Sequence, residues 1–249
     1  MKKFLLGAVG LVAIAVAAPA SAADLAARPY AKAPAFVAAV YDWSGFYIGA
    51  NGGYGTQRKC WDNTTAAGVF LAAEGCHDSD GAVAGGQVGY RFQTGGWVFG
   101  VEGQGDWADL RGSNTSLAFG GVTNRSRLDA FGLFTGQVGY AWNNALLYVK
   151  GGGAVTSNRY DTFSAAGVLT SSAKDDTRFG GTAGVGLEYG FAPNWSAAVE
   201  YDHIFVEKRV YGFTTPAGAA AGFDRIRGDV DLVTARINYR WGGPVVAKY

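Results

Sequence analysis

The chain has 249 residues and a formal net charge of +1, with 39 glycines, 14% aromatic residues and only 16% charged residues. Helical bundles favour Ala, Leu, Glu and Lys, whereas this composition favours strands, tight turns and close backbone contacts. The chain shows no global basic excess, so nucleic acid is not an expected partner.

The first 22 residues have the pattern of a secretory signal peptide. Lys2 and Lys3 precede an apolar and glycine run from Phe4 to Ala18, and Ala20-Ser21-Ala22 fits the small-x-small cleavage rule. A retained membrane anchor is the alternative, but the run is short for a span of about 20 residues. Residues 23–42, rich in alanine with two prolines, are predicted to be a flexible periplasmic lead-in.

Residues 43–241 show a period of about fifty residues. The segment Gly-Gln-Val-Gly-Tyr ending at Tyr90 recurs at Tyr140, and looser copies end at Tyr189 and Tyr239. A fixed period indicates a repeated structural unit. Each unit contains two predicted strands, so four units predict eight antiparallel strands.

Short and long connections alternate between the predicted strands. Short turn signals follow Phe92, Trp142 and Phe191. The other four connections are long and polar, at residues 57–81, 111–125, 161–176 and 208–224. This alternation is typical of a bacterial outer-membrane barrel with short periplasmic turns and long extracellular loops.

Within these strands one face is apolar and the other is polar. From Trp195 to Tyr201 every second residue is apolar, and Glu200 and Asp202 lie in the other set. A membrane barrel has this pattern, with apolar side chains toward lipid, and a closed barrel satisfies the backbone in lipid without helices. A soluble β-sandwich is the competing fold, but it does not explain the aromatic residues at each turn end. We therefore predict an all-β, eight-stranded antiparallel transmembrane β-barrel.

The polar face supplies charges of both signs to the lumen. An eight-stranded interior is only wide enough for its own side chains, and buried charges are costly unless paired. We predict a paired network that plugs the lumen, and a narrow polar conduit is the alternative. The predicted network is Arg91, Glu102, Asp106, Arg127, Asp129, Arg178, Glu188, Glu200, Asp202, Arg236 and Arg240.

Aromatic residues at the turn ends are predicted to form a girdle near the periplasmic membrane interface, where Trp and Tyr are enriched. One series consists of the tyrosines that recur about every fifty residues, and a second aromatic series recurs at nearly the same spacing from Tyr47 to Trp195. The predicted girdle is Tyr47, Tyr90, Trp97, Tyr140, Trp142, Tyr148, Tyr189, Trp195, Tyr239 and Trp241.

The two cysteines, Cys60 and Cys76, lie 16 positions apart in one polar segment. An exported chain meets an oxidising compartment, so we predict a disulfide, worth on the order of 3 kcal/mol in the loop-closure model. A metal site that adds His77 is the alternative, but it lacks a clear fourth ligand. Neither a metal nor a cofactor is predicted.

Catalysis is not predicted either. Of the two histidines, His77 lies in the first long connection, and His203 follows Asp202. Neighbours on a strand point to opposite faces, so Asp202 and His203 do not form a dyad. The chain has no Gly-x-Ser-x-Gly elbow, and the glycines at 151–153 do not form a phosphate loop.

A group of basic residues is predicted near the outer rim of the barrel. They could pair with lipopolysaccharide phosphates, and a solvated rim is an equally good explanation. The group is Arg111, Arg125, Arg127, Lys174, Arg178, Lys208, Arg209, Arg225 and Arg227.

The segment from Asp42 to Gly55, Asp-Trp-Ser-Gly-Phe-Tyr-Ile-Gly-Ala-Asn-Gly-Gly-Tyr-Gly, resembles the opening strand of the alphaproteobacterial small outer-membrane proteins. This is the immunogenic surface antigen family, with an eight-stranded OmpA-like barrel. The Gly-Gln-Val-Gly-Tyr repeats and the closing strand at 236–241 resemble the same family, so the likeness covers about 43–241. It implies an outer-membrane location, a surface or structural role and no catalytic residues. The tail at 242–249 departs from the family pattern, and Pro244 is expected to end the strand.

We therefore expect a monomeric barrel that contributes to envelope integrity at the outer-membrane surface. Its expected partners are outer-membrane lipid, lipopolysaccharide, and the barrel-assembly machinery during biogenesis. A narrow diffusion channel and a loop-mediated binder of host or phage surfaces are the alternatives.

Overall fold

The computed structural model describes residues 41–173 and 176–241, and the predicted signal peptide, residues 23–40 of the predicted lead-in and the C-terminal tail lie outside them. None of the described residues forms a helix long and apolar enough to cross a membrane. Their strands are β1 (Gly45–Thr64), β2 (Phe70–Thr94), β3 (Trp97–Thr115), β4 (Thr123–Trp142), β5 (Ala145–Phe163), β6 (Leu169–Ser172), β7 (Asp176–Ala192), β8 (Trp195–Val206), β9 (Arg209–Thr214), β10 (Ala220–Arg227) and β11 (Val230–Trp241).

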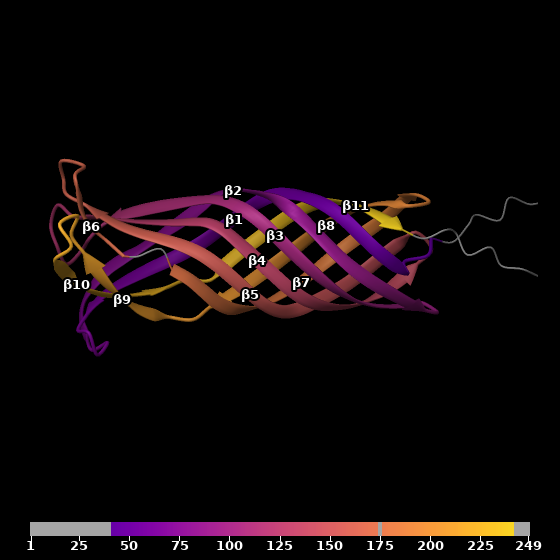
Figure 1. Ribbon diagram of the computed structural model, residues 1–249, viewed down its shortest axis with the longest axis horizontal. Coiled ribbons are helices and arrows are strands. Elements are labelled where there is room, and N and C mark those ends of the chain that lie inside the picture. The colour runs from indigo at the N-terminus through magenta and orange to yellow at the C-terminus, as the bar shows by residue number, and fades with distance from the viewer. Residues whose placement is uncertain (1–40, 174–175, 242–249) are drawn as a thin grey trace, which may run out of the picture. The chain divides into compact units, whose positions relative to one another are not determined.

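These strands occupy eight positions around one closed antiparallel ring, which confirms the predicted eight-stranded barrel. β6 and β7 both pair with β5, and β10 and β11 both pair with β1. β8 lies between β7 and β11, and β9 lies between β6 and β10. The short strands β6, β9 and β10 therefore continue the positions of β7, β8 and β11, and they lie together at one end of the barrel (Figure 1).

The two ends of the barrel have different connections. At one end, which we call the turn end, two-residue turns join β2 to β3, β4 to β5 and β7 to β8. Gly95 and Asn143 adopt left-handed backbone conformations there, with φ of 59° and 51°, as such tight hairpins require. The opposite end, which we call the hairpin end, carries the four connections predicted to be long loops.

Much of each predicted loop is strand, so the hairpins continue beyond the apolar band. Three of their tips share one turn, in which a Ser or Thr oxygen accepts the backbone N–H four residues later. The residue before that N–H is a glycine with φ near +80° in each case, at Gly68, Gly167 and Gly218. This repeated Ser/Thr-x-Ala-Gly turn closes each hairpin tightly, which leaves the remaining polar residues free to pair as strands.

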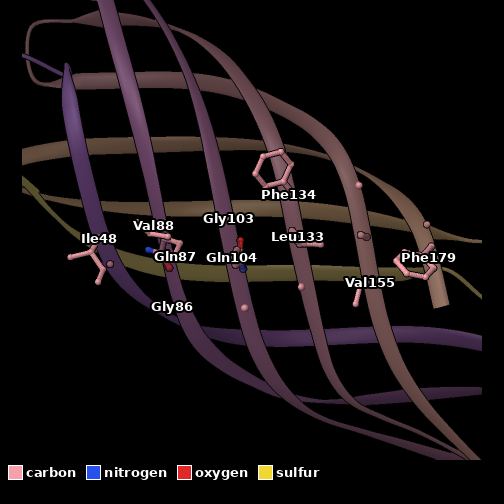
Figure 2. Close-up of a pocket in the computed structure, with 16 residues that line it drawn as sticks. Ile48, Gly86, Gln87, Val88, Gly103, Gln104, Leu133, Phe134, Val155 and Phe179 are labelled. Carbon is pink, nitrogen blue, oxygen red and sulfur yellow. The ribbon is translucent and has the colours of Figure 1, made fainter. Parts of the chain in front are cut away.

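The outer face carries an apolar band next to the turn end. Ile48, Val88, Phe134 and Phe179 are among its exposed side chains. A groove of about 720 Å³ lies between them, with Ile48 and Phe179 at opposite sides (Figure 2). Outward glycines of β3 and β5 form its floor, because the space beside them is open. This groove belongs to the face expected to contact lipid chains.

Candidate functional site: the filled lumen

The lumen at the level of the apolar band is filled by a charge network around Lys150. Its ammonium Nζ lies 2.7 Å from Glu200 Oε1, 3.2 Å from Asp202 Oδ1 and 3.5 Å from Glu102 Oε1. Arg236 also bridges Glu102, at 2.8 Å, and Glu200. All five side chains are at most 2% exposed. Two cations and three carboxylates from β3, β5, β8 and β11 thus meet in one buried cluster.

A second ion pair lies beside the first cluster. Arg91 on β2 and Glu188 on β7 approach to 2.8 Å, and Glu188 also accepts hydrogen bonds from Asn238 and Ser196. The Arg91 guanidinium stacks on the ring of Tyr47 at 4.5 Å. This pair therefore links opposite walls of the barrel.

Tyr47 and Tyr148 lie in the lumen, so their assignment to the outer girdle was wrong. Both are 2% exposed, and their hydroxyls donate to Glu102 and Glu200 at 2.7 Å. Gly89 and Gly186 lie directly under the two rings, where any Cβ would overlap them. The inward rings are possible because the neighbouring strand has glycine at the facing position.

The other predicted girdle residues lie on the outer face near the turn end. Their rings contact one another in pairs, such as Trp97 with Tyr140 and Tyr239 with Trp241. The outward set is Tyr90, Trp97, Tyr140, Trp142, Tyr189, Trp195, Tyr239 and Trp241.

Arg127 and Asp129 do not belong to the lumen network, which corrects the sequence-based prediction. Their side chains are 32% and 39% exposed and form a loose pair at 3.8 Å. A register shift between Leu128 and Ala130 inserts one extra residue into β4 relative to β5. Such a bulge exchanges the faces of the strand, so Leu128 points inward and its two charged neighbours point outward.

The remaining predicted lumen residues are buried outside the five-residue central cluster, which Asp106 adjoins through Gln104. Asp106 accepts a hydrogen bond from Gln104. Arg178 lies nearer the hairpin end, 5.6 Å from the ring of Tyr211. Arg240 is at the turn end, where it donates to the Ser44 carbonyl oxygen.

Above the charge network the lumen is filled by two apolar layers that the sequence analysis did not identify. The first is built mainly from Leu110, Leu128, Phe131, Ile204 and Leu232. The second is aromatic and contains Trp61, Tyr160, Tyr211, Phe213 and Ile226. Trp43 is buried at the turn end, where it packs on Tyr41.

One strand position shows the order of these layers. Starting at the turn end and moving along β11 and then β10, the inward side chains include, in order, Arg240, Arg236, Leu232, Ile226 and Asp224. The sequence contains one sign of the apolar layers at the start of β11. There Val230 and Leu232 point inward, and Asp231 between them points outward.

At the hairpin end the structure joins Cys60 and Cys76, which face each other on β1 and β2, in a disulfide. His77 forms hydrogen bonds with Asn114 Oδ1 at 2.8 Å and with Ser126 Oγ at 3.0 Å. The order Ser–His–Asn resembles a nucleophile, base and orienting group. Ser126 is only 1% exposed and also accepts from the Trp61 indole, so its oxygen is closed to a substrate.

Three titratable groups at the hairpin end are shifted by burial. Burial lowers the pKa of Lys59, whose ammonium donates to the Tyr160 hydroxyl and the Asn158 carbonyl oxygen, and burial also lowers the pKa of His77. Burial and the neighbouring Glu74 carboxylate raise the pKa of Asp224 to about 7. Each of these side chains is less than 10% exposed, so each faces the interior of the hairpin end rather than open solvent.

The predicted basic rim is mostly engaged with the protein itself. Arg111 pairs with Asp109, Arg125 stacks on the ring of Phe163, and Arg225 donates to a backbone carbonyl oxygen. Arg227 lies 3.9 Å from Asp62. Arg178 is inside the barrel, so its place on the rim was wrong. Lys208 and Arg209 are exposed, and Lys174 lies outside the described residues.

Comparisons with known proteins agree with this architecture. Residues 8–240 match the family model described as the outer membrane protein beta-barrel domain. The 31 kDa outer-membrane immunogenic protein of Brucella melitensis is 28% identical over 217 residues, which cover 80% of this chain and 85% of that protein. The 25 kDa outer-membrane immunogenic protein of Brucella ovis is 30% identical over 187 residues, with 74% and 80% covered.

Solved structures of outer-membrane proteins are also similar to the chain. The outer membrane protein OprG from Pseudomonas aeruginosa aligns with a TM-score of 0.47 and 13% identity, over 79% of this chain and 97% of OprG. Ail of Yersinia pestis aligns with a TM-score of 0.38 and 14% identity, over 79% of this chain and 99% of Ail.

Proposed function

The chain belongs to the family of outer-membrane β-barrel proteins, within its immunogenic surface antigens, and we propose that its role there is structural. It lies in the bacterial outer membrane. In this proposal the lumen is closed to ions, and the barrel contributes to envelope integrity. Its hairpin end faces the exterior, and it has no catalytic activity.

The observation that carries the proposal is that a charged layer and apolar layers of side chains fill the lumen one above the other. A conducting path would have to pass the Lys150 network and then the apolar layer around Leu128 and Leu232. Separating one partner of a buried ion pair costs about 3–5 kcal/mol. An apolar constriction also excludes water. Together the two layers favour a plug over the narrow conduit.

The test is single-channel recording of the refolded mature chain in planar bilayers. Folding is verified by the gel shift between unboiled and boiled samples, and a porin of known conductance is added last to show that the bilayer reports channels. We expect no current steps from the folded protein. Stable, reproducible steps before the porin is added would contradict the closed lumen.

A second candidate function, surface recognition through the hairpins, is favoured by exposed apolar side chains at their tips. Phe70 and Leu71 are exposed, and Leu117 is 79% exposed. In the proposed orientation this end lies beyond the lipid, and exposed apolar patches outside lipid mark interaction sites. Bacteria that carry Phe70→Ser, Leu71→Ser and Leu117→Ser should adhere less to an epithelial monolayer than wild type. Equal adhesion, with Arg127→Ser as the surface control, would exclude this candidate.

A further inference from the structure

The interior of the hairpin end contains a cavity of about 350 Å³, beyond the aromatic layer. Residues of β1, β2, β4, β5, β6, β9 and β10 line it, and two of them are the carboxylates Glu74 and Asp224. Glu74 is 3% exposed and Asp224 is 7% exposed. Two buried acidic groups from strands distant in sequence therefore share one cavity, whose rim includes the exposed Phe119.

No basic side chain of the described residues forms an ion pair with these two carboxylates. Glu74 accepts from the Asn124 amide at 2.8 Å and from the Ser116 hydroxyl at 3.1 Å, and Asp224 accepts from the Asn63 amide at 3.1 Å. All of these donors are neutral. In the membrane-level lumen, by contrast, Glu102, Glu188 and Glu200 each face an arginine or lysine.

Asn124 adds an unpaired oxygen to the same cavity. Asn124 is fully buried and lines the cavity. Its amide NH₂ donates to Glu74, but its carbonyl oxygen Oδ1 has no hydrogen-bond partner. A buried acceptor without a donor is costly. The cavity therefore has an excess of oxygen acceptors, two of which belong to buried carboxylates, and no basic side chain among the residues that the structure describes lines it.

We propose that this cavity binds a Ca²⁺ ion through the Glu74 and Asp224 carboxylates and the Asn124 carbonyl oxygen. Hard cations take oxygen ligands, and Ca²⁺ accepts six to eight of them in flexible geometry. Water completes the shell, because the cavity is many times larger than the roughly 30 Å³ that one water occupies. No three His, Cys, Asp or Glu side chains of the described residues gather as a metal cluster, which disfavours a transition-metal site.

The ion would tie together three separate strands, β2, β4 and β10, at the exposed end of the barrel. Extracellular calcium sites commonly have dissociation constants of about 10⁻⁴–10⁻³ M. Mg²⁺ demands stricter octahedral geometry, so it should bind this irregular set more weakly. Neither expectation depends on whether the lumen conducts.

The test is calorimetric titration of the refolded full-length mature protein with CaCl₂, at constant ionic strength and after EDTA treatment. The variants are Glu74→Gln and Asp224→Asn, which keep the shape of each side chain and remove its charge. Asp109→Asn is the matched control, because it removes an exposed carboxylate on the outer face of β3. The midpoint of heat unfolding in the gel-shift assay, with and without Ca²⁺, gives a second reading.

We expect one bound Ca²⁺ and a higher unfolding midpoint in wild type and in Asp109→Asn. Each of the two cavity variants should weaken binding at least tenfold while the barrel still folds. Absence of calcium binding by folded wild type would overturn the proposal, as would equal binding by the cavity variants. If a cavity variant does not fold, Asn124→Leu replaces it as the test, and undiminished binding there has the same meaning.

Discussion

The membrane-level barrel and its hairpin end are filled by different kinds of side chain. Next to the apolar band the interior holds Lys150, Arg236 and three carboxylates. In the hairpin end it holds the rings of Trp61, Tyr160 and Phe213. The same eight strand positions run through both regions, so the difference does not come from topology.

The difference follows from what surrounds each region. Lipid makes the outer face apolar, and the alternation of a strand then leaves polar side chains for the inside. Their charges persist because they are paired with one another. Beyond the membrane the outer face contacts water, so the apolar side chains can turn inward as they do in a soluble β-protein. The bulges in β3 and β4 lie where this exchange takes place.

The largest expected effect is at Arg236. Arg236→Met keeps most of the volume but leaves Lys150 as the one cation among the described residues that pairs with Glu102 and Glu200, so we expect a loss of about 3–5 kcal/mol in the free energy of unfolding. Urea unfolding of the refolded barrel, followed by tryptophan fluorescence and the gel shift, measures it. Arg127→Met is the control, because its exposed pair with Asp129 should contribute less than about 1 kcal/mol. Equal effects of the two variants would contradict the contrast between paired lumen charges and surface charges.

The next effect should be confined to the hairpin end. Trp61→Ala removes a fully buried indole from the aromatic layer, which should cost about 3 kcal/mol. Because the charge network lies well below this layer, the membrane-level barrel should remain folded. Limited proteolysis of intact proteoliposomes should cut the variant in its hairpins and leave a protected fragment. Loss of the gel shift as well would show that the two regions do not unfold separately.

A smaller effect is expected from the disulfide. Replacing Cys60 and Cys76 by serine opens a 16-residue loop, and we expect a loss of about 2–3 kcal/mol in hairpin stability. The pairing of β1 with β2 extends on both sides of the bridge, so the hairpin should still form. Proteolysis of oxidised, reduced and doubly substituted protein compares them directly. Faster cleavage of only the reduced protein would point to the reductant rather than the bridge.

Sequence alone predicted the barrel because lipid imposes a strict period of two, as between Trp195 and Tyr201. The wrong predictions arise where a bulge shifts the period of two, or where a contact with the neighbouring strand decides the direction of a side chain. The extra residue near Leu128 reversed the faces assigned to Arg127 and Asp129. Tyr47 points inward because Gly89, on the neighbouring strand, leaves room for its ring, and one strand's pattern does not contain that information. The disulfide required only the proximity of two exported cysteines.

The smallest effect is a pH dependence at His77. Burial lowers the pKa of His77 below its usual 6.5, so between these two values the unfolded chain binds one proton more than the folded protein. Hairpin stability should therefore be complete above pH 6.5 and fall as the pH drops through that value. His77→Gln cannot be protonated and should remove this part of the pH dependence. Heat-unfolding midpoints at pH 5 and pH 8 compare the variant with wild type, and parallel pH profiles would show that His77 is not the responsible group.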